Sequence, residues 1–484
     1  MQKVIIIGGG IAGLIAAHVL ADYCREILII ERDVLPAGPA TRPGTPQAYH
    51  PHHLTPRGRM ILQQLFPGLN NELLQNGAAS SLGKEIWFSY PSGDLHIPEP
   101  ANEAACSRSF LEWHIRSRVL KKETIQLLPA TTVNDLLIDK THNNVYGVTA
   151  TRGNETIQLH ADMVVVATGF HSHLSEWLHR QGYTIPEPEI LTTLLGYSTR
   201  HYAFPASRSV PWSLLHAENP ERPEVPTCVA SFMENNVLEI ILGNIGGQYP
   251  PTDSDGFEKV LQLLNIPALQ EVLQQVTPLE APRGYRIKDV TFRHYEKMAS
   301  WPDGLLAIGD TFCTFDPIHG TGMTIAAMQA DLLQTMLQQR SSLDASLGRD
   351  FLQAAARIVE PAWWMNAVAD YGQPEVQHKY ATPQKGLAFA HVFMEQAMQF
   401  AVQLREPALF GLVWLVKTSF LSPRELINRP MFQMLQEAGM AGPLEALIQA
   451  GKATDVAQWQ DDICPDIPDY EDTLFIPRQV LQGS

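Results

Sequence analysis

The sequence predicts an α/β fold with a parallel sheet at the N-terminus, an inserted antiparallel sheet and a helical C-terminal region. Three observations predict it. Residues 4–20, VIIIGGGIAGLIAAHVL, combine an apolar strand, a glycine-rich turn and an Ala/Leu-rich helix. Long β-type runs occupy residues 190–282, and helical periodicity dominates from Leu332 onward.

The glycine turn has the spacing of a dinucleotide-binding βαβ unit. Gly8 allows a tight strand-to-helix turn, Gly10 lets the backbone approach a pyrophosphate, and Gly13 lets helix and strand pack closely. The helix N-terminus adds free N–H groups and a positive dipole end. A second apolar strand, 26–30, ends at Glu31, close to the spacing of about 20 residues for an acid that binds a ribose hydroxyl. A dinucleotide site is therefore expected here.

Length and composition restrict the class of protein. A chain of 484 residues is long enough for two or three domains. Its formal net charge of −16 and lack of a basic run argue against nucleic-acid binding. Its five cysteines are scattered without a C-x-x-C pair, so we expect neither disulfides nor zinc, and a cytoplasmic location. No apolar window of about 18 residues predicts a membrane span.

The segment after Glu31 is rich in proline and glycine and carries Arg42 and three histidines, His50, His52 and His53. No acidic or cysteine ligand stands nearby and Pro51 interrupts the histidines, so pocket lining or solvation is favoured over a metal site. Residues 82–98 resemble a hairpin around PSG. The helical stretch SRSFLEWHIRSRVL follows, and its three arginines, Arg108, Arg116 and Arg118, could form no more than a solvated face.

Further along, short strands are expected at 147–151, 156–159 and 163–167. The block 190–282 contains no nucleotide motif, so we assign it to the wall of an apolar substrate pocket. A strand then ends at Gly309-Asp310, and a second glycine-rich turn opens a helix near Gly320. The apolar stretch ALFGLVWLV is too short to span a bilayer; core packing is expected, with peripheral membrane contact as the alternative.

With both glycine turns placed, the chain resembles the class A FAD-dependent monooxygenases, the p-hydroxybenzoate-hydroxylase-like proteins. The squalene-epoxidase-like and polyether-epoxidase-like branch looks nearest. The likeness extends over nearly the whole length. It is carried, in order, by RPGTPQAYHPHHL, SRSFLEWHIRSRV, DMVVVATGFHSHLSEWL, LLGYSTRHY, GQYPPTDSDGF, VTFRHYE and the GD segment that ends in GTGM.

The resemblance implies FAD as the cofactor and NAD(P)H as a transient co-substrate. It implies that Glu31 holds the adenosine ribose, that Arg42 and Arg116 contact the FAD phosphates or ribityl chain, and that Asp310 takes a ribityl hydroxyl. His319 and Asp316, beside the second turn, are the expected proton-steering groups. The expected cofactor-binding residues are Gly8, Gly10, Ile11, Ala12, Gly13, Glu31, Arg32, Arg42, Arg116, Val133, Gly309, Asp310, Gly320, Thr321, Gly322 and Met323.

The implied fold is a Rossmann-type FAD-binding domain with a glutathione-reductase-like βαβ unit. The expected domains have three parts. The FAD-binding domain is discontinuous and comprises residues 1–81, 98–189 and 283–340. The substrate-binding antiparallel sheet comprises 82–97 and 190–282, and the mainly helical C-terminal region comprises 341–484.

The chain departs from the family at its middle motif, where Val166, Phe170 and His173 replace an acid and two arginines. We expect weak NAD(P)H binding as the consequence. The alternative is that the missing acid serves FAD, in which case its loss weakens flavin binding. In the GD segment, Asp316, His319 and Thr321 also differ from the branch's N-P-x-Y-G-Q-G-M.

The implied activity is hydroxylation or epoxidation of an apolar, aromatic or alkene small molecule through a C4a-hydroperoxyflavin, with O2 as oxidant, in secondary metabolism. The alternatives are an FAD-dependent reductase or dehydrogenase, or a flavin-binding isomerase, cyclase or binding protein. Halogenation is disfavoured because the W-x-W-x-I-P signature is absent. A monomer or homodimer is expected.

Overall fold

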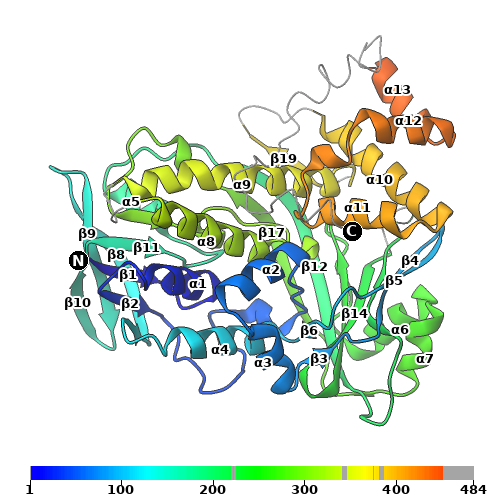
Figure 1. Cartoon of the computed structure of the whole chain (residues 1–484), viewed down its shortest axis with the longest axis horizontal. Coiled ribbons are helices and arrows are strands. Elements are labelled where there is room, and N and C mark those ends of the chain that lie inside the picture. Colours follow the sequence, from blue (N-terminus) through cyan, green and yellow to red (C-terminus); the bar gives the residue numbers. More distant parts are fainter. Residues whose placement is uncertain are drawn as a thin grey trace.

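The computed structural model describes residues 2–219, 222, 225–340, 346–373, 375–380 and 386–450. A parallel sheet covered by helices forms one side of the molecule, and a large mainly antiparallel sheet stands beside it (Figure 1). The C-terminal helices α10 to α13 gather at the far side of this second sheet, at the upper right of the view. The predicted fold class is confirmed.

The parallel sheet has the order β18-β11-β1-β2-β7. Its central strands are apolar and buried throughout, as expected for strands that are covered on both faces. Ile7 pairs with Val166, and Val166 pairs with Ala307, so the turns that follow β1, β11 and β18 lie side by side. Its strands are β1 (Lys3–Ile7), β2 (Glu26–Ile30), β7 (Ile125–Leu128), β11 (Met163–Val166) and β18 (Leu305–Ala307).

The second large sheet has nine strands, and its main path is β16-β12-β15-β14-β13-β4-β5. The turn between β14 and β15 falls at Asn235 and Asn236, which both have positive φ (62° and 55°), as the asparagine pair predicts. One pairing, β13 with β4, is parallel. The strands of this path are β4 (Glu85–Tyr90), β5 (Gly93–Pro98), β12 (Glu189–Ala203), β13 (Trp212–Ala217), β14 (Thr227–Met233), β15 (Val237–Asn244) and β16 (Thr277–Pro278).

Two further strands join this sheet beside β12. β17 (Arg283–Phe292) pairs with β12 along its whole length, and β19 (Gln377–Lys379) pairs with the start of β12. The prediction that the FAD-binding part resumes at residue 283 is therefore wrong for 283–292. The alternation of RGYRIKDVTF is that of a strand, but it does not reveal which sheet the strand joins.

Two small sheets complete the strands. A three-stranded sheet with the order β10-β9-β8 is inserted in sequence between β7 and β11, and a two-stranded pair joins β3 to β6. These strands are β3 (Ala79–Ser80), β6 (Ala104–Ala105), β8 (Thr131–Asp139), β9 (Asn144–Arg152) and β10 (Glu155–His160).

The helices cover the sheets and close the C-terminal side. The apolar helix α11 packs through Phe410 against Phe88 of β4, with ring centroids 4.4 Å apart, so it is part of a buried cluster. None of the helices in the described ranges combines the length and hydropathy that crossing a bilayer requires. The helices are α1 (Ile11–Leu20), α2 (Pro56–Leu65), α3 (Leu69–Gln75), α4 (Arg108–Val119), α5 (Leu174–Arg180), α6 (Ser254–Leu264), α7 (Pro267–Leu273), α8 (Gly322–Gln338), α9 (Leu347–Asp370), α10 (Leu387–Leu404), α11 (Pro407–Lys417), α12 (Arg429–Glu437) and α13 (Gly442–Ala450).

Candidate functional site

A cavity of about 1600 Å³ runs from the carboxyl ends of the parallel strands to the inner face of the large sheet. Both glycine turns line it, and so does α11 from the C-terminal region. Ligand sites usually have volumes of roughly 300–1,000 Å³, so this cavity is large enough for a dinucleotide and a second molecule. Its position at the strand ends is where α/β folds bind their ligands.

The three glycines of the first turn have separate structural roles. Gly8 has a φ of +110°, and a Cβ there would lie 2.3 Å from the carbonyl oxygen of Ala167. A Cβ on Gly13 would lie 2.0 Å from the carbonyl oxygen of Gly8, so α1 approaches the turn too closely for any side chain. A Cβ on Gly10 meets no backbone, and its nearest neighbours are guanidinium nitrogens of Arg42 at 3.8 Å and Arg108 at 3.9 Å. The space in front of Gly10 is thus lined by cations.

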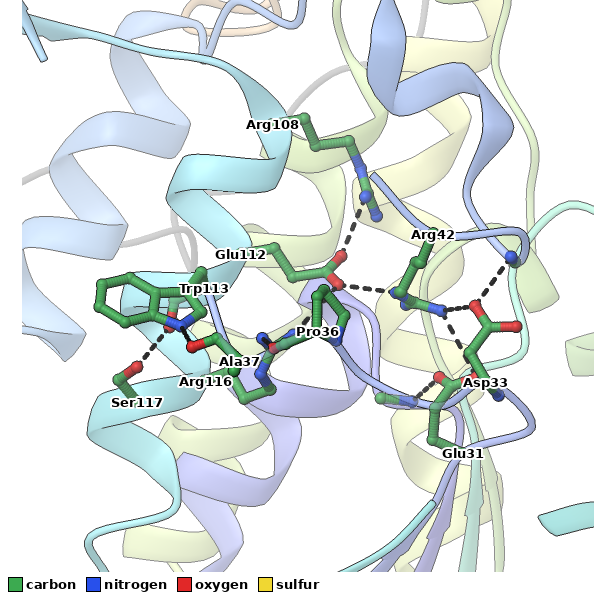
Figure 2. A network of polar contacts seen from close by, with 12 residues as sticks. Glu31, Asp33, Pro36, Ala37, Arg42, Arg108, Glu112, Trp113, Arg116 and Ser117 are labelled. Atoms are coloured by element: carbon green, nitrogen blue, oxygen red, sulfur yellow. Dashed lines mark hydrogen bonds and ion pairs between the residues drawn. The ribbon is translucent and has the colours of Figure 1, made fainter. Parts of the chain in front are cut away.

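These cations belong to a buried ionic network (Figure 2). Arg42 contacts Glu112 at 2.9 Å, Asp33 at 2.6 Å and Glu31 at 3.4 Å. Arg108 contacts Glu112 at 2.9 Å from the first turn of α4. The Glu31 carboxylate also accepts hydrogen bonds from the backbone N–H groups of Gly9 and Asp33. The network holds Glu31 and both arginines at the cavity wall with fixed orientations.

Arg116 is not among the residues that line this cavity, so the structure does not support its predicted contact with FAD. Its guanidinium donates a hydrogen bond to the carbonyl oxygen of Pro36 at 2.7 Å and lies 3.9 Å from Glu112. Arg108 occupies the place that was expected for Arg116. The position of Arg108 near the start of α4, next to the N-cap Ser107, is the feature of the sequence that could have indicated its place at the cavity.

The start of α4 is fixed by the large sheet. Glu234, at the tip of the β14–β15 hairpin, accepts hydrogen bonds from the backbone N–H of Ser107 at 2.8 Å and from its hydroxyl at 2.6 Å. The Ser107 hydroxyl in turn caps α4 by accepting from the N–H of Phe110. Arg108 is therefore positioned by a residue of the sheet that forms the opposite wall of the cavity.

The turn at Gly309 and Asp310 and the second glycine turn, 320–323, lie on the other side of the same cavity. Gly309 and Asp310 follow β18, and the N–H of Gly309 donates to Gln329 of α8 at 2.7 Å. Burial raises the pKa of the Asp310 carboxyl. Arg293 joins this turn to the turn after β11 by donating to the carbonyl oxygens of Asp310 at 2.8 Å and Phe170 at 3.2 Å. The turn 320–323 then presents the N-terminus of α8 to the cavity.

A buried acid–histidine group stands beside the second turn. Nε2 of His319 lies 2.8 Å from Oδ1 of Asp370 on α9, and His319 lines the cavity. Asp370 and Asp316 are fully buried. Burial and the neighbouring Asp370 raise the pKa of Asp316 to about 7. Burial opposes the charged form of His319, but Asp370 outweighs it, so the pKa of His319 is raised.

Asp370 was not predicted, because it is distant in sequence and lies in a stretch that reads only as helix. The structure places it against Nε2 of His319, a residue that lines the cavity.

The comparisons with known proteins agree with this geometry. Residues 3–171 match the family of FAD dependent oxidoreductases. Protein Rv3254 of Mycobacterium tuberculosis is 28% identical over 76% of this chain and 79% of its own length. Squalene monooxygenase 1,1 of Brassica napus is 25% identical over 74% of this chain and 67% of its own length.

Solved structures share the fold. The flavin-dependent brominase Bmp2 superposes with a TM-score of 0.59 at 15% identity, over 86% of this chain and 93% of the brominase. PqsL, a probable FAD-dependent monooxygenase from Pseudomonas aeruginosa, gives 0.56 at 16% identity, over 85% of this chain and 99% of PqsL. Over residues 3–171 the chain thus matches FAD dependent oxidoreductases, and its relatives include proteins named squalene monooxygenase. FAD is its cofactor, and the open, cation-lined space at Gly10 fits a pyrophosphate.

The fold brings most of the expected site residues to the cavity. Those that line it are Gly8, Gly10, Ile11, Ala12, Glu31, Arg32, Arg42, Val133, Gly309, Asp310, His319, Gly320, Gly322 and Met323. Those that do not line it are Gly13, Arg116, Asp316 and Thr321. Gly13 and Thr321 belong to the two turns without lining the cavity themselves, and Asp316 is buried behind His319.

The middle motif of the chain is only partly at the cavity. Val166 is fully buried within the parallel sheet and does not line the cavity, so an acid at this position would not meet a ligand there. Phe170 and His173 do line it. The His173 ring is mostly exposed and its Nδ1 lies 2.5 Å from Glu176. The expectation that position 166 is a ligand contact is therefore wrong, whereas 170 and 173 remain at the cavity.

The three histidines after Arg42 also line the cavity, and each has its own protein partner. His50 contacts the Thr199 hydroxyl at 2.9 Å, Nδ1 of His52 contacts the His50 carbonyl oxygen at 2.8 Å, and His53 contacts Ser231 at 3.2 Å. Burial lowers their pKa values to about 3 for His50 and about 4 for the other two. They are neutral at physiological pH.

The far wall of the cavity is mostly apolar. Tyr197, Val229 and Ile241 face it from neighbouring strands of the large sheet, and Trp414 and Leu415 face it from α11. Phe232, by contrast, packs mainly with Phe204 and Trp212 in the cluster on the opposite face of the sheet, although it reaches the cavity margin. The contribution of α11 was not foreseen, because an apolar helix reads equally as core.

Proposed function

We propose that this protein is an NAD(P)H-consuming monooxygenase that hydroxylates or epoxidises an apolar, aromatic or alkene small molecule. The observation that supports this proposal is that both glycine turns and an apolar wall line one cavity of about 1600 Å³. The relatives named squalene monooxygenase support an apolar substrate class. The placement in secondary metabolism stays a prediction.

In this proposal FAD supplies the redox chemistry and activates O2. Gly10, Arg42 and Arg108 bind its pyrophosphate, and Glu31 takes the adenosine ribose. The N-terminus of α8 faces the isoalloxazine edge, where its dipole favours negative charge. The apolar wall orients the substrate and excludes water.

His319 is the proposed proton-holding residue beside the second turn. Asp370 accepts a hydrogen bond from Nε2–H of His319, which favours the charged imidazolium and leaves Nδ1–H as the second donor of a ring that lines the cavity. Asp316 supports the pair from behind rather than touching the ligand. The catalytic role assigned to Asp316 thus becomes a positioning role.

The test of the proposed function is oxygen-18 incorporation. Under ¹⁸O2, the product of a turned-over substrate is expected to carry one labelled oxygen atom, and candidate substrates are found first by their acceleration of anaerobic flavin reduction. A product that forms without label while NAD(P)H is consumed would identify a reductase or dehydrogenase instead. Product formation without any NAD(P)H consumption would identify a non-redox flavoprotein.

The second proposal concerns nicotinamide handling. Phe170 and His173 offer no permanent cation, so anaerobic flavin reduction by NADPH or NADH is expected to show weak apparent affinity. A Phe170→Arg, His173→Arg variant is expected to bind NADPH about tenfold or more tightly, since each charge-assisted hydrogen bond contributes about 1.5–3 kcal/mol. His179→Arg adds an exposed charge on α5 away from the cavity and is the control. Wild-type reduction that already saturates at low micromolar coenzyme would refute this idea.

A further inference from the structure

A buried carboxyl group in the large sheet is connected to the cavity by two hydrogen bonds. Glu239 of β15 and Ser231 of β14 are direct cross-strand partners, so their side chains share one face of the sheet. Oγ of Ser231 lies 3.1 Å from Oε1 of Glu239 and 3.2 Å from Nε2 of His53. Ser231 and Glu239 are almost completely buried, at 1% and 4% exposure, whereas His53 lines the cavity.

His53 stands beside the second glycine turn. Its carbonyl oxygen lies 3.6 Å from the position that a Cβ on Gly320 would occupy. The chain of hydrogen bonds therefore begins inside the sheet and ends at the His53 ring, which lines the cavity, while the His53 backbone lies beside the turn that precedes α8.

The surroundings of Glu239 favour its protonated form. Glu234 approaches it from the hairpin tip, Cys106 lies near it before α4, and His201 is its cross-strand partner on β12. No ion pair joins Glu239 to a cation among the described residues. Burial, with Glu234 adding to it, raises the pKa of Glu239 to about 8.

The histidine at the other end is neutral. Burial lowers the pKa of His53 to about 4, and Arg59 and His216 act in the same direction. A neutral imidazole that accepts from Ser231 at Nε2 carries its proton on Nδ1, whereas one that donates at Nε2 has a free lone pair on Nδ1. The tautomer of His53 is thus coupled through Ser231 to the protonation of Glu239.

We propose that Glu239, Ser231 and His53 form a proton relay that supplies a proton to an anionic oxygen at the flavin end of the cavity. The Glu239 proton moves to Oγ of Ser231, the Ser231 proton moves to Nε2 of His53, and the Nδ1 proton of His53 moves to the acceptor. Glu239 ends as a carboxylate and the acceptor ends neutral, so one proton is transferred and charge is conserved. In this relay His53 contacts the ligand directly, and Ser231 and Glu239 act through His53.

The proposal uses the bound flavin but not the identity of the organic substrate, so it can be tested without one. Reoxidation of an anionic reduced flavin by O2 to hydrogen peroxide takes up one proton. FAD-loaded protein is photoreduced without oxygen, mixed with oxygenated buffer, and followed by the return of oxidised-flavin absorbance between pH 6 and 10. The wild type is expected to be fast at low pH and to slow through an ionisation near pH 8.

The variants separate a relay from a structural role. Glu239→Gln and Ser231→Ala are expected to slow the low-pH rate about tenfold or more and to lose the ionisation, since positioned acids contribute about 10²–10⁴-fold. Ser231→Thr retains the hydroxyl and should restore both. Glu360→Gln removes another carboxyl whose pKa is raised and which does not line the cavity, and it should behave as the wild type.

An infrared titration gives a readout that does not depend on activity. The FAD-loaded protein is expected to show a protonated-carboxyl band that disappears with a pKa near 8 and is missing from Glu239→Gln but present in Ser231→Ala. If that band is absent from the wild type, or if Ser231→Ala keeps the wild-type pH profile, the relay is overturned. Either result leaves oxygen-18 incorporation unaffected, so failure of the relay is distinguishable from failure of the proposed function.

Discussion

A Gly10→Val variant is expected to fold normally and to purify without colour. The structure leaves room for a Cβ at this position, and Gly10 has an ordinary φ of −79°, so the backbone is not strained. The added side chain instead fills the space beside the Arg42 and Arg108 guanidinium groups, where we propose that the FAD pyrophosphate binds. We expect FAD affinity to fall by at least about a hundredfold, or roughly 3 kcal/mol.

The matched control is Gly13→Ala at the same turn. A Cβ there would lie 2.0 Å from the Gly8 carbonyl oxygen, so this variant should lose folded yield as well as flavin. The measurement is the FAD-to-protein ratio together with the thermal unfolding midpoint of the apoprotein. A Gly10→Val protein that is fully yellow with unchanged affinity would show that the pyrophosphate binds elsewhere.

Removing Arg42 is expected to have the largest effect on stability. Arg42 is 7% exposed and contacts three buried carboxylates, of Glu31, Asp33 and Glu112. Arg42→Met would leave these charges close together without their shared cation. Breaking a buried ion pair in this way typically costs about 3–5 kcal/mol, so the variant should unfold at much lower denaturant concentration and bind no FAD.

Arg108→Met tests the same network with a milder change. Glu112 keeps its contact with Arg42, so stability should change little. FAD affinity should fall about tenfold to a hundredfold through loss of one charge-assisted contact. Arg116→Met should leave FAD affinity almost unchanged, because Arg116 contacts Pro36 and not the cavity. The reverse order of Arg108 and Arg116 in a flavin titration would contradict our assignment.

The sequence was most informative where a function depends on neighbours in the chain. The first turn could be predicted because strand, glycine spacing and acid all lie within residues 4–31. The choice between Arg108 and Arg116 could not be predicted in this way. Eight residues of helix rotate by a little more than two turns, so periodicity places both arginines near one face, yet they lie roughly 12 Å apart along the axis. Only the packing of α4 decides which one meets the cavity.

Residues that act through tertiary contacts gave still less signal. Asp370 lies in a helix of ordinary composition and approaches His319 only because α9 packs behind the second turn. Glu239 is a single acid in an apolar strand, and its link to His53 requires both the β14–β15 register and the path of the segment before α2. Such pairings depend on sheet order, which local propensity does not encode.

The hydrogen bonds from Ser107 to Glu234 make the two halves of the cavity thermodynamically interdependent. Arg108 begins the helix that Glu234 anchors, and Glu234 sits on the hairpin that carries Ser231 and Glu239. A ligand that shifts this hairpin must also shift the first turn of α4. Because such coupling is reciprocal, a substrate that tightens FAD binding through this anchor is itself bound more tightly, by the same factor, when FAD is present. The occupancy of the FAD part of the cavity then depends on the occupancy of the substrate part, and the reverse also holds.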